Sequence, residues 1–233
     1  MQTNPYQFTP HIGQRWVTGA LHQSMRQVLV MTILLLLATL AILPHAARAS
    51  EPASGDDAAA TQIAGQVCSN CHGPAGVSVS PLFPRLAGQQ EQYLAAQIRA
   101  FKAKTRSDPE AHNYMWGMAT LVSEPMIDAL ARYYASQKPG PGISGNPARI
   151  ETGKHLFEQG IPERGVVACA SCHGAGAEGS AIFPRLAGQH AAYLVRQLEV
   201  IQKQLRSSPI MHGIIKDLKP DEMKAVAEYL QAQ

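Results

Sequence analysis

Apolar residues recur at helical spacing through most of the chain after residue 58, and no stretch alternates as a half-buried strand does. In residues 90–104 one helix face carries Tyr93, Leu94, Gln97, Ile98 and Phe101. Residues 190–205 repeat this pattern, and Ser123 is a good N-cap for another helix. Further helices are expected at residues 58–67, 123 or 124–136, 148–159 and 220–231. The pattern predicts an all-α fold.

The chain repeats itself once after residue 50. The sequence Phe-Pro-Arg-Leu-Ala-Gly-Gln occurs at residues 83–89 and again, unchanged, at residues 183–189. A Cys-x-x-Cys-His motif at residues 68–72 recurs at residues 169–173. A period of about one hundred residues is longer than that of solenoid repeats, so it indicates the tandem duplication of a whole domain.

Proline and glycine alternate between the two copies, which prevents a helix from continuing there. The expected domains are therefore residues 50–139 and 148–233, joined by an extended linker at residues 140–147. Units of this size bury little surface, so a large bound group would help to complete each core. We expect two small helical units, each wrapped around one such group.

Residues 1–49 have the features of a signal peptide. Arg26 precedes an apolar run at residues 28–43, and Ala47-Arg48-Ala49 supplies a small-x-small cleavage site. The segment before the run is long for a leader, so the true start is expected at Met25. The run is shorter than the about 20 apolar residues of a membrane span, although an uncleaved membrane anchor is the alternative. An exported, periplasmic protein is expected.

The charge of the chain excludes one class of partner. Three of the 20 Lys and Arg residues lie in the leader, which leaves 17 basic residues against 17 acidic ones. The sequence has no basic run and no basic stripe interleaved with aromatic residues. A nucleic-acid partner is therefore not expected.

The four cysteines form two pairs, each followed directly by a histidine: Cys68 and Cys71 before His72, and Cys169 and Cys172 before His173. This is the sequence of covalent c-type haem attachment. Two thiols three residues apart lie on one side of a helical turn, where they can form thioethers with the vinyl groups of a porphyrin. The next residue then turns its imidazole toward the iron. We expect two covalently bound haem c groups, with His72 and His173 as iron ligands.

Other uses of a Cys-x-x-Cys pair are half of a zinc site, a redox disulfide and an accidental spacing. A zinc site of four thiolates would not explain the histidine in each motif. The presence of two copies at the same place in a duplicated domain favours haem.

Methionine would complete the iron coordination that is typical of electron-carrying cytochromes. Aligning the two closing helices places Met115 on Met211, each in a Met-x-Gly sequence and in an expected loop. Met118, which falls on Ile214, is the main rival of Met115. Other methionines lie on the closing helices, where packing is the better interpretation.

The remaining histidines near these sites do not match each other across the repeat. His112 and His212 are expected at the surface or beside a haem propionate. His155 and His190 are expected to be exposed.

A metal-bound imidazole usually donates its free N–H to a nearby acceptor. We expect the carbonyls of Pro84 and Pro184 to be these acceptors. The arginines that follow, Arg85 and Arg185, would then pair with haem propionates, the alternative being a rigid turn with solvated arginines. Further candidates beside the haem are Tyr93 and Tyr193, with Gln89, Gln97, Gln189 and Gln197 as polar partners or helix surface.

Together these residues resemble the dihaem cytochrome c4 family over residues 58–231. The resemblance rests on both haem motifs, the doubled Phe-Pro-Arg-Leu-Ala-Gly-Gln, the downstream tyrosines, Met-x-Gly, and the Ala-rich closing helix. Residues 157–167 also look like the second domain of that family. The resemblance implies two cytochrome-c-like folds related by pseudo-twofold symmetry, with His/Met ligation at both haems. It also implies a periplasmic role between a quinol-oxidising complex and a terminal oxidase.

The expected function is one-electron transfer, in which the haem carries the chemistry and no protein group acts as an acid, base or nucleophile. Association with the membrane would come through a partner or an uncleaved leader. The alternatives are a cytochrome subunit of a dehydrogenase and a dihaem thiosulfate-oxidising enzyme. Such an enzyme would carry an unusual ligand at one haem, whereas both halves here contain an equivalent methionine.

Overall fold

The computed structural model describes residues 55–233, which belong to one compact unit running from Pro52 to Gln233. The predicted signal peptide at residues 1–49 and the proposed start at Met25 lie outside the described residues. Within residues 55–233, no helix is long and apolar enough to cross a membrane.

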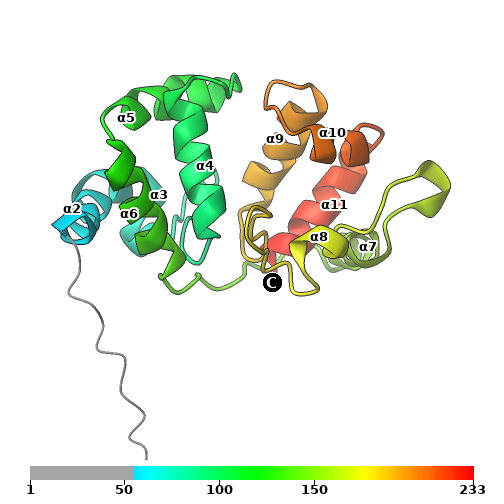
Figure 1. The fold of residues 1–233 in the computed structure, drawn as a ribbon. Helices are drawn as coiled ribbons and strands as arrows, with labels where there is room; N and C mark the ends of the chain where they lie inside the picture. The colour runs from blue at the N-terminus through cyan, green and yellow to red at the C-terminus, as the bar shows by residue number, and fades with distance from the viewer. Residues whose placement is uncertain (1–54) are drawn as a thin grey trace, which may run out of the picture. The chain divides into compact units, whose positions relative to one another are not determined.

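The first copy of the repeat folds into helices α2 to α6 (Figure 1). Helix α2 continues into a π-helical turn, and the short helix α3 follows it directly. The elements in order are α2 (Gly55–Ile63), a π-helical turn (Ala64–Cys68), α3 (Ser69–His72), a 3₁₀ turn (Pro74–Gly76), α4 (Glu91–Lys102), a second π-helical turn (Ala111–Met115), α5 (Trp116–Thr120) and α6 (Glu124–Ala135).

The second copy follows the same order with helices α7 to α11 (Figure 1). Its elements are α7 (Pro147–Gln159), a 3₁₀ turn (Pro162–Arg164), α8 (Ala170–His173), α9 (Ala191–Gln202), α10 (Pro209–Ile215) and α11 (Pro220–Gln231). Beside the helices, the described residues form three isolated antiparallel bridges and no strand. The all-α prediction is confirmed.

Local signals explain where the helices begin. The Ser123 hydroxyl accepts a hydrogen bond from the Met126 N–H at 3.4 Å and so caps α6 as predicted. Asn146 does the same for α7, since its side-chain oxygen accepts from the N–H groups of Ala148 and Arg149. This second cap was not part of the sequence prediction, although asparagine followed by proline is a common way to open a helix.

Each half has its own apolar core. In the first half Ile127 and Leu130 of α6 pack with Leu94 of α4. In the second half Phe157 of α7 is fully buried against α11. Because α7 and α11 cross closely at Gly153, a Cβ there would lie 2.0 Å from a backbone oxygen of α11. Two separate cores are what a duplicated domain would need.

Candidate haem-binding sites

The two thiol pairs lie where a helix begins. Cys68 ends the first π-helical turn, and α3 carries the second thiol and His72; Cys169 immediately precedes α8, which carries its partner thiol and His173. The four thiols form no disulfide. Among residues 55–233, no group of three or more His, Cys, Asp or Glu side chains is arranged to hold a metal ion. The structure therefore does not bring the two pairs together as a shared zinc site would require.

The leading thiol of each pair lies in an apolar environment. Burial raises the pKa of Cys68. Burial also raises the pKa of Cys169 to about 11. Reactive redox cysteines instead have pKa values lowered by nearby positive charge, so these two thiols do not resemble a disulfide-exchange site.

The two motif histidines are buried and held in the same way. The Nδ1 atom of His72 lies 2.8 Å from the Pro84 carbonyl oxygen, and that of His173 lies 2.9 Å from the Pro184 carbonyl oxygen. Since a carbonyl can only accept, Nδ1 must carry the hydrogen in both rings. Burial lowers the pKa of both imidazoles. Each ring is therefore neutral at neutral pH, with its lone pair on Nε2.

The free nitrogen of His173 fits a haem iron. The Nε2 atom of His173 is buried and has no hydrogen-bond partner in the described structure. A buried polar atom is rarely left without a partner, so this lone pair needs an electron-pair acceptor. The rings of Phe83 and Phe183 stand edge-on to the two imidazoles, at centroid distances of 6.3 and 6.5 Å. Together with the adjacent thiols, these groups fit a covalently attached haem in each half.

The methionines at 115 and 211 occupy helical turns, so the expectation that both lie in loops is wrong. Met115 ends the second π-helical turn, and Met211 lies within α10. The helical turn containing Met211 begins at Pro209, whose fixed φ favours the first position of a helix. Both side chains are half-buried, whereas Met118 is more exposed. Ligation of iron by either methionine stays a prediction, although π-helical turns are frequent at functional sites.

The two arginines that follow the prolines differ in their contacts. Arg85 donates to three carbonyl oxygens, through Nε to Ser78 and through Nη1 to Pro141 and Gly188. Burial lowers its pKa. The Nε atom of Arg185 is buried and has no partner among the described residues. The role of both arginines toward propionates stays a prediction.

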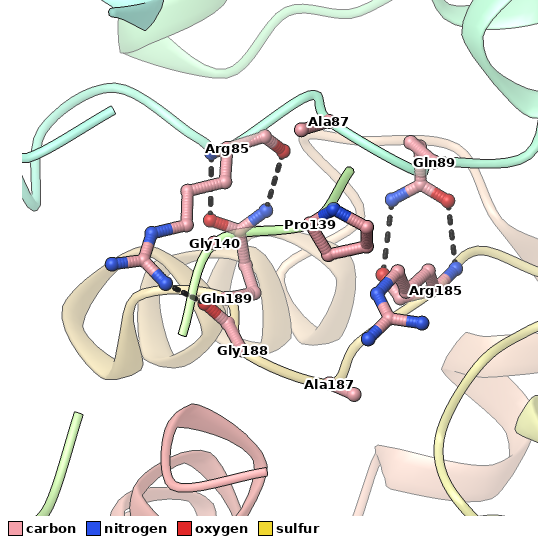
Figure 2. Close-up of a pocket in the computed structure, with 9 residues that line it drawn as sticks. All are labelled: Arg85, Ala87, Gln89, Pro139, Gly140, Arg185, Ala187, Gly188 and Gln189. Atoms are coloured by element: carbon pink, nitrogen blue, oxygen red, sulfur yellow. Dashed lines mark hydrogen bonds between the residues drawn. The ribbon is translucent and has the colours of Figure 1, made fainter. Parts of the chain in front are cut away.

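A pair of buried glutamines joins the two halves (Figure 2). The side chain of Gln89 donates to the Arg185 carbonyl at 2.9 Å and accepts from the Arg185 N–H at 2.7 Å. Gln189 makes the same two bonds with the backbone of Arg85, both at 2.9 Å. The repeated Phe-Pro-Arg-Leu-Ala-Gly-Gln segments therefore bind each other, and we call these four bonds the glutamine clasp.

The two tyrosines lie beside a buried arginine cluster, and their expected contact with the haems stays a prediction. The Tyr93 hydroxyl accepts a hydrogen bond from Nη2 of Arg206 at 2.6 Å. Burial and the neighbouring Tyr93 raise the pKa of Tyr193. Arg206 and its counterpart Arg106 are not among the residues predicted for the sites. The repeat itself contained the signal, since Arg-Ser-x-Pro occurs at residues 106–109 and again at residues 206–209.

The expectation for His190 is wrong, because this side chain is 2% exposed. It stands immediately before α9, and its Nε2 atom lies 3.0 Å from the Ser78 carbonyl oxygen of the first half. Contact between the halves thus buries a residue that the sequence of one half alone would leave at the surface. His112 and His155 are exposed as expected, and His212 is half-buried with Nδ1 at 3.2 Å from the Ile201 carbonyl oxygen.

Comparison with known proteins gives matches over most of the chain. A cytochrome c family profile matches residues 150–233. The chain is 38% identical over 190 residues to cytochrome c4 of Thiocapsa roseopersicina, which covers 79% of this chain and 96% of that relative. It is also 38% identical over 220 residues to a thiosulfate dehydrogenase electron acceptor of Thiomonas intermedia, which covers 90% of this chain and 94% of that relative.

A solved structure of Acidithiobacillus ferrooxidans cytochrome c4 is similar as well. It shares 39% identity and a TM-score of 0.68, and the match covers 71% of this chain and 98% of that chain. These relatives are cytochromes and electron-transfer proteins, and the family attaches haem c covalently. With its helical fold and its paired haem motifs, this chain belongs to the cytochrome c4 family.

Proposed function

We propose that this protein is a periplasmic electron carrier with two covalently bound haem c groups, one in each half. The residues assigned to the haems are Cys68, Cys71, His72 and Met115 in the first half, and Cys169, Cys172, His173 and Met211 in the second. One observation carries this proposal: both halves place a neutral, buried imidazole directly after a pair of thiols, with its Nδ1–H donated to a proline carbonyl. Two equivalent sites favour electron storage and transfer over catalysis at one special site.

The protein groups have distinct roles at each site. The thiols would tether the porphyrin, while the carbonyls of Pro84 and Pro184 hold the imidazoles in one orientation and would make Nε2 a stronger ligand. Met115 and Met211 would supply the thioether ligands, which would favour the reduced state and raise the reduction potential. The bound iron supplies reversible one-electron transfer.

The proposed partners are a quinol-oxidising complex as electron donor and a terminal oxidase as acceptor. A thiosulfate dehydrogenase is a second candidate donor, because the Thiomonas relative that carries that description matches 90% of this chain. Under both proposals the protein receives and passes on electrons without converting a substrate itself.

The haem count tests the core of the proposal. The full chain, expressed with haem-attachment machinery in the periplasm, should show two haems per chain in an alkaline pyridine spectrum. The oxidised protein should also show the weak absorption of a sulfur-to-iron bond. The double variants Cys68→Ala/Cys71→Ala and Cys169→Ala/Cys172→Ala should each retain one haem. Wild-type protein with one haem or none would overturn the proposal.

Electron-transfer assays distinguish the donors. The oxidised protein is mixed with a quinol-oxidising complex and quinol, or with a thiosulfate dehydrogenase and thiosulfate, and reduction is followed by absorbance. Fast reduction that saturates with the quinol-oxidising complex supports the first donor. Fast reduction only in the thiosulfate mixture would replace it with the second.

A further inference from the structure

A buried pair of like charges lies between the two halves. Arg106 and Arg206 are 6% and 8% exposed, and their backbones form an isolated antiparallel bridge. The side-chain oxygen of Gln97 accepts from both guanidinium groups, at 3.1 and 2.9 Å, and that of Gln197 does so at 3.1 and 2.6 Å. The two guanidinium groups therefore lie close enough to share the same two acceptor oxygens. The glutamine amides are neutral, so they bridge the two positive charges without cancelling them.

One carboxylate accompanies these two cations. Asp108 is 1% exposed and accepts two hydrogen bonds from Arg106, both at 2.9 Å. In the second copy the equivalent position is Ser208, because Arg-Ser-Asp-Pro is replaced by Arg-Ser-Ser-Pro. Arg206 bonds instead to the neutral groups of Gln197, Gln97 and Tyr93. Among the described residues the cluster thus has two positive charges, one negative charge and two tyrosine hydroxyls.

The cluster is attached to the segments that carry both proposed methionine ligands. The indole Nε1 of Trp116, the neighbour of Met115, donates to the Arg106 carbonyl at 2.9 Å. Arg206 lies five residues before Met211 along the chain. A charge in this water-poor interior is weakly screened, so it acts over longer distances than a surface charge does.

We propose that Asp108 sets the reduction potentials of the two haems by cancelling one of the two buried arginine charges. This inference rests on the proposed function. Removal of one electron adds one positive charge to a haem, which a nearby buried cation opposes. The surplus charge of the cluster therefore raises both potentials, and Asp108 limits that rise. Since Asp108 belongs to the segment that leads to Met115, its effect is larger on the haem of the first half.

Two substitutions move the charge of the cluster in opposite directions. Asp108→Asn increases its positive charge by one and keeps the side-chain shape. Ser208→Asp decreases it by one at the N-cap of α10, a position that favours aspartate. The double variant Asp108→Asn/Ser208→Asp restores the original charge. Glu110→Gln is the matched control, because it removes a carboxylate two residues away whose side chain is 31% exposed and paired with Arg196.

The measurement is a spectroelectrochemical titration of each haem-loaded variant, from which both midpoint potentials are fitted. At a fixed potential, Asp108→Asn should raise the ratio of reduced to oxidised haem by about three- to tenfold, and a tenfold change corresponds to about 59 mV. Ser208→Asp should lower the ratio by a similar factor. In the double variant the ratio of reduced to oxidised haem, averaged over the two haems, should return to within about twofold of the wild-type ratio at the same fixed potential. Glu110→Gln should change the ratio by less than about twofold, because solvent screens its charge.

A merely structural role of Asp108 would not give shifts of opposite sign that cancel in the double variant. The inference would be overturned if the midpoint potentials were unchanged in both Asp108→Asn and Ser208→Asp. It would also be overturned if they shifted in the same direction in both variants. If Asp108→Asn does not mature, Ser208→Asp alone decides it by the sign of its shift. The haem count of the same samples separates the two proposals: two haems with unmoved potentials refute this inference alone, and fewer than two in wild type refute the proposed function.

Discussion

Replacing Gln89 with leucine removes half of the glutamine clasp that joins the two halves (Figure 2). Gln89 is 7% exposed and forms two hydrogen bonds with the backbone of Arg185. Leucine has a similar volume but can neither donate nor accept. The Arg185 N–H and carbonyl would therefore lose these bonds in a partly buried place.

The size of the effect follows from the two groups that lose their partners. A buried backbone donor or acceptor without a hydrogen bond costs about 1–3 kcal/mol. Two such groups lower the free energy of unfolding by about 2–6 kcal/mol. For a protein of this size each kcal/mol shifts Tm by about 2–4 °C, so Gln89→Leu should lower Tm by about 4–24 °C.

Differential scanning calorimetry of the haem-loaded protein measures this shift. Gln189→Leu should give a comparable loss, because the clasp is nearly symmetric. The control is Gln62→Leu, at an exposed position of α2, which should leave Tm within about 2 °C of wild type. A Gln89→Leu protein that melts as the control does would show that these buried hydrogen bonds do not hold the halves together.

Three further predictions follow from buried residues elsewhere. Burial lowers the pKa of His190 in the folded state, so the unfolded chain binds a proton at a higher pH than the folded chain does. The free energy of unfolding therefore falls as the pH drops below the unfolded pKa of about 6.5. The substitution His190→Gln should weaken this dependence, measured as Tm at about pH 7 and about pH 5. Gly153→Ala should lower the free energy of unfolding by at least about 1–3 kcal/mol in thermal melts, because its Cβ would lie 2.0 Å from the backbone of α11. The control is Gly55→Ala, whose Cβ would have no atom within 4 Å and which should not lower the free energy of unfolding. Met211→Leu should weaken the sulfur-to-iron absorption and lower one midpoint potential. The control is Met223→Leu, in the core of the second half, which should change the free energy of unfolding by less than about 1.5 kcal/mol and leave that absorption intact.

Much of the local structure could be predicted because it depends on residues close together in the chain. Helical spacing located α4, α6, α9 and α11 to within a few residues, and Ser123 marked the start of α6. The haem motifs could be recognised for the same reason, since the two thiols and the imidazole need a spacing that one helical turn supplies. The contact of each imidazole with a proline carbonyl spans only 12 or 11 residues within one repeated segment.

The contacts between the halves could not be predicted in this way. The sequence indicated that residues 83–89 and 183–189 are equivalent, but equivalence does not show that Gln89 binds the backbone of Arg185. The sequence predicts a surface position for His190 and does not mark Arg106 and Arg206 as site residues, because their burial comes from a segment about one hundred residues away. Residue order along the chain therefore determined the helices and the haem chemistry, whereas packing of one copy against the other decided which polar side chains are buried. The reason is physical: a helical turn is set by neighbouring residues, but the desolvation of a charge depends on every segment that excludes water from it.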